Sequence, residues 1–160
     1  MFNTASFNFV KNLSTISTDL PKENRTISKS YTKDAMALCV SDAAKIGIDI
    51  EKKLKRSPET IIHFVKKYIT FQIKSIPSDM NEQWFYKAWT AMESYFKLAG
   101  KGFSTPKNFV LDIEQQLILH DGKQAAWLEY FNIGNFVICI CSDTAFSKQD
   151  VQISFHGWEG

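Results

Sequence analysis

The chain has 160 residues, of which 44% are hydrophobic and 22% are charged, and its formal net charge at pH 7 is +2. A chain of this size buries roughly two thirds of its unfolded surface, so we expect one folded domain and exclude overall disorder. The small net charge does not predict nucleic-acid binding, which requires a strongly basic surface. The 3 cysteines are odd in number, and two of them stand one residue apart in an apolar run, which favours reduced thiols. We therefore expect a cytoplasmic protein with no leader peptide and no membrane span.

The N-terminal part of the chain, residues 1–34, is rich in Ser, Thr and Asn and has weak hydrophobic periodicity. This composition predicts a loose arm, followed by one domain over residues 35–160. The domain begins with an apolar stretch from Ala35, and the stretch KIGIDIE follows it and ends at Glu51. These two stretches predict two strands joined by a tight turn.

Two helices are predicted in the middle of the chain. Ser57 is a good N-cap and Pro58 fits the first helical position, so a first helix is expected from Pro58 to about Ile69. A longer helix is expected from roughly Asn81 to Ala99, closed by Gly100.

Four apolar segments follow the long helix, and Asp121-Gly122 is a hairpin signal between the second and the third. They predict an antiparallel sheet. An order of strands, then helices, then strands is typical of an α+β domain rather than of a doubly wound parallel one.

The long helix carries two rows of residues. Apolar residues at spacings of three and four are expected to face the core, and they are Phe85, Ala88, Met92, Tyr95, Phe96 and Ala99. Trp89, Glu93 and Lys97 form a second row at strict four-residue spacing. Taken alone, that row predicts a surface Glu–Lys pair that stabilises the helix by about 0.2–0.5 kcal/mol and needs no function.

The stretch GIDIE has two acids at alternate positions. In a strand, Asp49 and Glu51 lie on one face and Ile48 and Ile50 on the other. Any strand with one wet face shows such alternation. Two carboxylates on one face also suit Mg²⁺, which prefers oxygen ligands and takes the rest from water and substrate phosphates. Glu93 is a candidate for a third acid.

The two motifs together resemble a known family. GIDIE is followed by Trp89, Glu93, Ser94, Lys97 and then Gly-Lys-Gly at 100–102, in the pattern W-x-x-x-E-S-x-x-K-x-x-G-K-G. This order and spacing is similar to that of the 4′-phosphopantetheinyl transferases of the surfactin-synthetase type, and the similarity runs from about residue 27 to 142. The resemblance implies an antiparallel sheet packed against the long helix. One half-domain would be complete, and residues 1–34 would be an arm or the remnant of a truncated first half.

The resemblance implies transfer of 4′-phosphopantetheine from coenzyme A to a serine hydroxyl of an acyl, peptidyl or aryl carrier protein. Adenosine 3′,5′-bisphosphate would be released, and Mg²⁺ would be required. By the same resemblance, Asp49, Glu51 and Glu93 would hold the metal, Glu93 and Lys97 would be catalytic, and the coenzyme would contact Ser28, Lys29, Lys97 and Lys101.

Three departures from the family pattern affect the coenzyme site. Lys29 stands where the family usually has histidine, and a lysine can still hold a phosphate as a point charge. Met92 stands where lysine is common, and its place on the apolar stripe indicates that the lysine is dispensable. The segment before GIDIE is short for this type of enzyme, so one wall of the coenzyme cleft is expected to come from a second copy in a homo-oligomer or from a partner.

Lys52, Lys53, Lys55 and Arg56 directly follow GIDIE, and such a run is usually a solvated segment. Within this family it could also attract coenzyme phosphates or an acidic carrier protein. Two other functions remain as alternatives. One is a catalytically decayed module that binds coenzyme A or a carrier protein, and the other, minor one is nucleic-acid binding through this basic run.

Overall fold

The computed structural model of the protein describes residues 5–8, 26–41, 44–68, 72–74, 76–78, 81–100, 108–148 and 151–154. The elements in chain order are β1 (Ala5–Asn8), β2 (Thr26–Thr32), β3 (Ala35–Ser41), β4 (Ile46–Lys52), α1 (Pro58–Tyr68), β5 (Gln72–Lys74), α2 (Glu82–Ala99), β6 (Phe109–Asp112), β7 (Leu117–His120), β8 (Lys123–Ile133), β9 (Phe136–Ser142) and β10 (Val151–Ser154).

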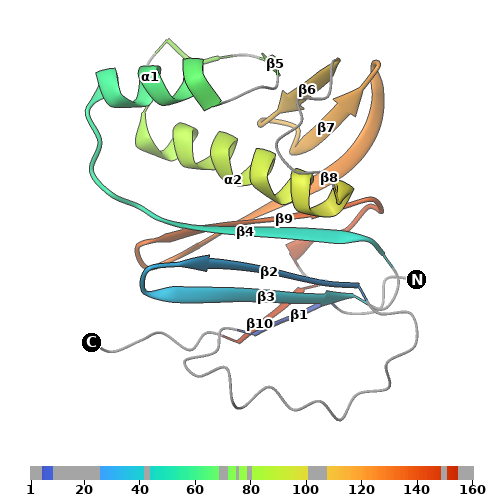
Figure 1. The fold of residues 1–160 in the computed structure, drawn as a ribbon. Coiled ribbons are helices and arrows are strands. Elements are labelled where there is room, and N and C mark those ends of the chain that lie inside the picture. The colour runs from blue at the N-terminus through green and yellow to red at the C-terminus, as the bar shows by residue number, and fades with distance from the viewer. Residues whose placement is uncertain are drawn as a thin grey trace.

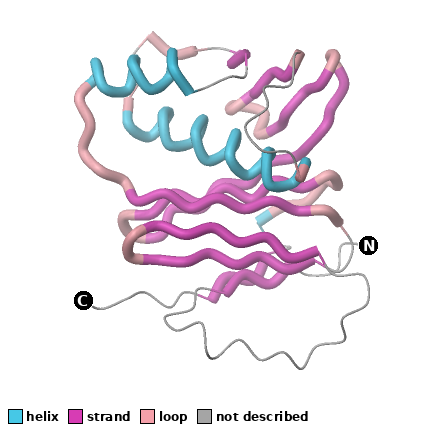
Figure 2. The backbone as a smooth tube through the Cα atoms, in the orientation of Figure 1, coloured by secondary structure: helices cyan, strands magenta, loops and turns pink. Residues whose placement is uncertain are grey.

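These elements form three layers, with the two helices above one sheet and a second sheet below it (Figure 1). The tube view in Figure 2 shows the same separation of helices from strands. The sheet next to the helices has the order β4-β9-β8-β7-β6-β5, and the other has the order β10-β1-β3-β2. The predicted α+β class is therefore confirmed. The sheets are mixed rather than purely antiparallel, because β5 pairs with β6, and β1 with β10, in parallel.

Two predictions about the N-terminal half are wrong. Residues 26–32 are not a loose arm but strand β2, which pairs with β3 over its whole length, whereas the alternative that residues 1–34 are the remnant of a first half-domain remains a prediction. The strands β3 and β4 do not form a hairpin either, because β3 pairs with β1 and β2 whereas β4 pairs with β9. The physical reason is that β3 and β4 each have an apolar face and lie in different layers, so these faces pack against each other instead of the strands pairing edge to edge. Their side chains meet face to face, as Ala37 and Cys39 do with Ile48 and Ile50 in one buried cluster.

The helices begin and end close to where the sequence predicts. The side chain of Asn81 caps α2 by accepting a hydrogen bond from the Trp84 backbone N–H, and Gly100 ends the helix at φ 64°. Ser57 Oγ accepts from the backbone N–H of Thr60 at the start of α1. The predicted end of α1 at Ile69 lies outside the described residues.

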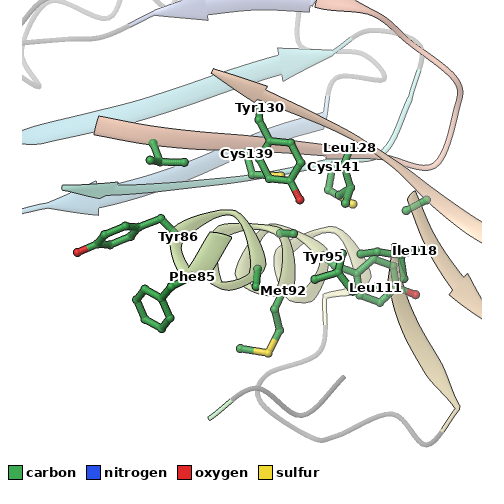
Figure 3. Close-up of a cluster of buried hydrophobic side chains, with 14 of the residues drawn as sticks. Phe85, Tyr86, Met92, Tyr95, Leu111, Ile118, Leu128, Tyr130, Cys139 and Cys141 are labelled. Atoms are coloured by element: carbon green, nitrogen blue, oxygen red, sulfur yellow. The ribbon is translucent and has the colours of Figure 1, made fainter. Parts of the chain in front are cut away.

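The apolar stripe of α2 faces the core as predicted, except for Ala99, which is exposed in the last turn. Figure 3 shows Tyr130 from β8 and Cys139 and Cys141 from β9 over one side of α2, with Met92 on the side away from Tyr130. All of these side chains belong to one buried cluster. The predicted turn at Asp121-Gly122 is also present, with positive φ at both residues, as a tight hairpin requires.

Gly47 allows α2 to lie directly on β4. A Cβ atom at this position would stand 1.8 Å from the backbone oxygen of Ser94. A side chain here would therefore push the helix away from the strand. The glycine of GIDIE thus sets the distance between the strand and the helix that carry the predicted site residues. In the described part of the chain, neither helix is long and apolar enough to cross a bilayer.

Candidate active site

The predicted site residues meet where α2 crosses β4 and where the edges of the two sheets come together. The strand β4 lies at the edge of the six-stranded sheet and β2 at the edge of the four-stranded one, side by side beneath α2 (Figure 1). Two hydroxyl groups join these edges. Ser28 Oγ accepts a hydrogen bond from the Ile48 backbone N–H at 3.0 Å, and Ser30 Oγ donates to Asp49 Oδ1 at 2.8 Å.

Asp49 and Lys97 form an ion pair at this crossing. Lys97 Nζ donates to Asp49 Oδ1 at 2.8 Å and to Ser30 Oγ at 2.8 Å. The Asp49 side chain is only 6% exposed, whereas that of Lys97 is 31% exposed. Burial raises the pKa of Asp49, and the Lys97 charge and the hydrogen bonds from Lys97, Ser30 and the Ile50 backbone oppose that rise. The pair therefore joins a buried acid to a cation that still reaches solvent.

Glu51 points toward the same helix row. Trp89 Nε1 donates a hydrogen bond to Glu51 Oε1 at 3.2 Å. Burial is the main cause that raises the pKa of Glu51, and the negative charge of Asp49 adds to it. The strict spacing of Trp89 and Lys97 thus has a structural meaning, because each of them holds one of the two acids of β4.

Glu93 lies between Trp89 and Lys97 on the helix row. Burial and then the Asp49 charge raise its pKa to about 7, the Lys97 charge opposes this, and Glu51 adds a smaller rise. Its Oε1 atom and Asp49 Oδ2 are buried and have no hydrogen-bond partner. A buried, partnerless carboxylate oxygen is costly, so two of them in one site favour a ligand that brings positive charge.

The donor set fits a hard divalent cation such as Mg²⁺, because all three acids offer oxygen atoms. Within the described residues, however, no three His, Cys, Asp or Glu side chains are gathered closely enough to form a ready-made metal centre. The charges explain this, since three carboxylates repel one another while Lys97 and Trp89 hold two of them. The predicted metal set therefore remains a prediction that the two partnerless oxygens support.

The four residues predicted to contact coenzyme A do not all lie together at this site. Ser28 is buried and its oxygen accepts the Ile48 N–H, whereas Lys29 is exposed on the other face of β2 with its Nζ 5.7 Å from the centre of the Tyr31 ring. Lys97 lies at the site, as described above. Lys101 lies outside the described residues.

Ser30 and Arg56 also belong to the surroundings of the site. The resemblance places Ser30 in the stretch Ser28-Lys29-Ser30, which stands where the family has its Ser-His-Ser coenzyme segment, but it assigns Ser30 no role of its own, and it does not single out Arg56. Arg56 is not simply solvated, as its basic run suggests. Its guanidinium lies over the rings of Phe64, Phe85 and Tyr86, its Nε donates to Tyr86 Oη at 3.1 Å, and its charge lowers the pKa of Glu51.

Comparison with known proteins identifies the family to which the chain belongs. The profile of the 4′-phosphopantetheinyl transferase superfamily matches residues 45–152, and the chain belongs to this superfamily. It is 35% identical over 88 residues to the 4′-phosphopantetheinyl transferase Sfp of Bacillus subtilis (strain 168), a match that covers 55% of this chain and 38% of that protein. A 4′-phosphopantetheinyl transferase of Bacillus subtilis is 33% identical over 69 residues, which cover 43% of this chain and 31% of the relative. The two matches thus cover only 38% and 31% of the relatives' own lengths.

Proposed function

We propose that the protein transfers the 4′-phosphopantetheine group from coenzyme A to a serine hydroxyl of an apo carrier protein. The reaction would be Mg²⁺-dependent and would release adenosine 3′,5′-bisphosphate. Membership of the superfamily and the names of the two relatives support this proposal. The observation that carries it is the pair of buried, partnerless oxygens, Asp49 Oδ2 and Glu93 Oε1, beside the Lys97 ammonium.

Each residue has a role that follows from its chemistry. Asp49, Glu51 and Glu93 would hold Mg²⁺, which when bound neutralises the charge of the pyrophosphate. Lys97 would stabilise the negative charge that develops on the phosphate oxygens in the transition state. Its side chain suits this role because it is anchored by Asp49 at the base of the site and is still 31% exposed.

Glu93 is also our candidate for the group that accepts the proton of the attacking serine hydroxyl. A general base works best when its pKa lies near the operating pH, and that of Glu93 is raised to about 7. An ordinary exposed glutamate would be a weaker base. The half-buried position of Glu93 beside two other acids is what supplies the added basicity.

We assign the contacts with the phosphates of coenzyme A to Ser28, Lys29, Lys97 and Lys101. Lys29 is suited to a phosphate as an exposed ammonium group on β2. The partners we propose are coenzyme A and an acyl, peptidyl or aryl carrier protein. A homo-oligomer that completes the coenzyme site remains a prediction, which light scattering of the purified protein would test.

A cytoplasmic location also remains a prediction. It is supported by the free and buried thiols of Cys39, Cys139 and Cys141, which are compatible with a reducing compartment.

Incubation of the protein with coenzyme A, Mg²⁺ and a panel of apo carrier proteins tests the proposal. Intact-mass spectrometry should detect one added phosphopantetheine on the acceptor serine of at least one carrier. Calorimetric binding of coenzyme A without any such addition would instead identify a binding module. Met92 does not support the binding-module alternative, because its side chain is fully buried in the core and does not lie in the place of a site lysine.

A further inference from the structure

We infer that Ser30 is a positioning residue, whose hydroxyl fixes Asp49 and Lys97 in the one arrangement that leaves Asp49 Oδ2 free to face a metal ion. The inference rests on the proposed function and adds to it a residue that touches neither metal nor substrate. Ser30 is 5% exposed and comes from the four-stranded sheet, whereas Asp49 and Lys97 belong to β4 and α2.

The hydroxyl proton of Ser30 is already used in a hydrogen bond within the site. A serine hydroxyl has one proton to donate and two lone pairs to accept with. Ser30 donates its proton to Asp49 Oδ1 at 2.8 Å, and one of its lone pairs accepts from Lys97 Nζ at 2.8 Å. Because a phosphate oxygen can only accept, it would find no proton left on Ser30. The geometry therefore separates Ser30 from the residues that would contact coenzyme phosphates.

The same bonds orient the Asp49 carboxylate. Both Ser30 and Lys97 bond to Oδ1, and Oδ2 remains buried without a partner. Without the Ser30 hydroxyl, one of the two side-chain hydrogen bonds to the carboxylate is lost, and the Lys97 ammonium loses one of its two acceptors. The carboxylate and the ammonium could then rotate toward each other and share both oxygens, which would remove the free oxygen from the site.

Ser30 also fixes the position of β2 against β4. The two strands lie at the edges of different sheets, and two hydrogen bonds join them: Ser28 Oγ accepts from the Ile48 backbone N–H, and Ser30 Oγ donates to the Asp49 side chain. In other metal sites, residues that hydrogen-bond to the metal ligands orient those ligands, and their removal weakens metal affinity or activity by about 10- to 100-fold. We expect a loss of that size here.

The test uses Ser30→Ala and the conservative variant Ser30→Thr, which keeps a hydroxyl group and suits a strand. Ser142→Ala is the matched control, because Ser142 is 1% exposed and its Oγ accepts one backbone hydrogen bond, from Thr144 N at 3.1 Å, away from the acids. The first measurement is titration of each metal-free protein with Mn²⁺, followed by electron paramagnetic resonance. The second is coenzyme A affinity in a metal-free buffer, and circular dichroism and thermal unfolding establish that each variant is folded.

Ser30→Ala should weaken Mn²⁺ binding by about 10- to 100-fold, with recovery in Ser30→Thr and a change of less than about twofold in Ser142→Ala. Coenzyme A affinity without metal should fall by less than the Mn²⁺ affinity does, because Lys97 loses one acceptor but keeps its ion pair with Asp49. A folded Ser30→Ala protein with wild-type Mn²⁺ affinity would overturn the inference. So would a loss confined to metal-free coenzyme A binding, which would make Ser30 a phosphate contact.

These outcomes are separable from a failure of the proposed function. If no carrier protein is modified but Ser30→Ala still loses Mn²⁺ affinity, the transfer reaction is refuted and the positioning role stands. A wild-type protein that binds no Mn²⁺ would overturn both the metal site and the role of Ser30.

Discussion

Lys97 Nζ lies 2.8 Å from Asp49 Oδ1 and joins α2 to a strand residue 48 positions earlier in the chain. The pair has a structural role as well as a proposed chemical one, because Asp49 is buried and would otherwise be an unpaired anion. Removal of one partner of a buried pair leaves the other uncompensated.

Lys97→Met should therefore destabilise the metal-free protein by about 1–3 kcal/mol at pH 7, since it leaves the Asp49 carboxylate with Ser30 as its remaining side-chain partner. Urea unfolding in the presence of a chelator measures this. Lys74→Met is a suitable control, because Lys74 pairs with Asp112 from a side chain that is 55% exposed and should change stability by about 0–1 kcal/mol. Equal effects of the two substitutions would contradict a special role of the Asp49–Lys97 pair.

Glu93 should make the stability of the metal-free protein depend on pH. Its pKa in the folded protein is about 7 and its ordinary value is 4.5, so the folded state binds the extra proton between these two values. The contribution of Glu93 to stability is therefore fully present below about pH 4.5 and is lost as the pH rises through about 7.

Glu93→Gln should remove this loss, so the variant should exceed the wild type in stability at pH 8 and match it near pH 4.5. Urea unfolding at several pH values in a chelator gives the difference. Added Mg²⁺ should stabilise the wild type at pH 8 and the variant much less. A difference between the two proteins that does not change with pH would show that Glu93 titrates normally.

Gly47→Ala should disrupt the contact between β4 and α2. The added Cβ would stand 1.8 Å from Ser94 O and 2.7 Å from Leu98 N, both backbone atoms that cannot move aside without the helix. We expect a loss of about 3 kcal/mol or more, at the upper end for an overpacked site. Gly134→Ala meets no atom within 4 Å and carries only the strain of φ 53°, which amounts to about 1–2 kcal/mol. Thermal unfolding of both variants decides, and a tolerated Gly47→Ala would mean that the helix does not rest on the strand as described.

Met92→Lys should destabilise the protein without improving transfer. Met92 is fully buried among core side chains, so lysine would place a charge in an apolar environment, at a cost of several kcal/mol. Met92→Leu, which roughly conserves volume, should cost less than about 1.5 kcal/mol. Unfolding and transfer assays on both variants are the measurement, and a stable, faster Met92→Lys enzyme would show that this position serves the phosphates after all.

The sequence predicted those parts of the molecule that depend on local periodicity. Four-residue spacing placed Glu93 and Lys97 on one helix row, and two-residue spacing placed Asp49 and Glu51 on one strand face, which together locate the site. Local periodicity does not predict contacts between segments that are distant in the sequence. Ser30 lies in a polar stretch that looked like an arm, and its hydrogen bond to Asp49 depends on how two sheet edges meet.

The pairing of β3 and β4 was mispredicted for a related reason. Two short apolar strands close in sequence look like a hairpin whether they pair edge to edge or stack in separate layers. Asp49 also illustrates what periodicity cannot decide. Alternation showed which face it occupies, but only the close approach of α2 over Gly47 makes that face buried.

The most direct test of the account is single-turnover transfer from coenzyme A to an apo carrier protein, followed by intact-mass spectrometry, with the wild type, Glu93→Gln and Glu129→Gln. Glu129 is a half-buried acid on β8, where its loss should leave the site intact. The account predicts that the wild type and Glu129→Gln add phosphopantetheine to the carrier serine, and that Glu93→Gln is slower by about 100-fold or more. A Glu93→Gln protein that transfers at the wild-type rate, or a wild type that modifies no carrier, would contradict it.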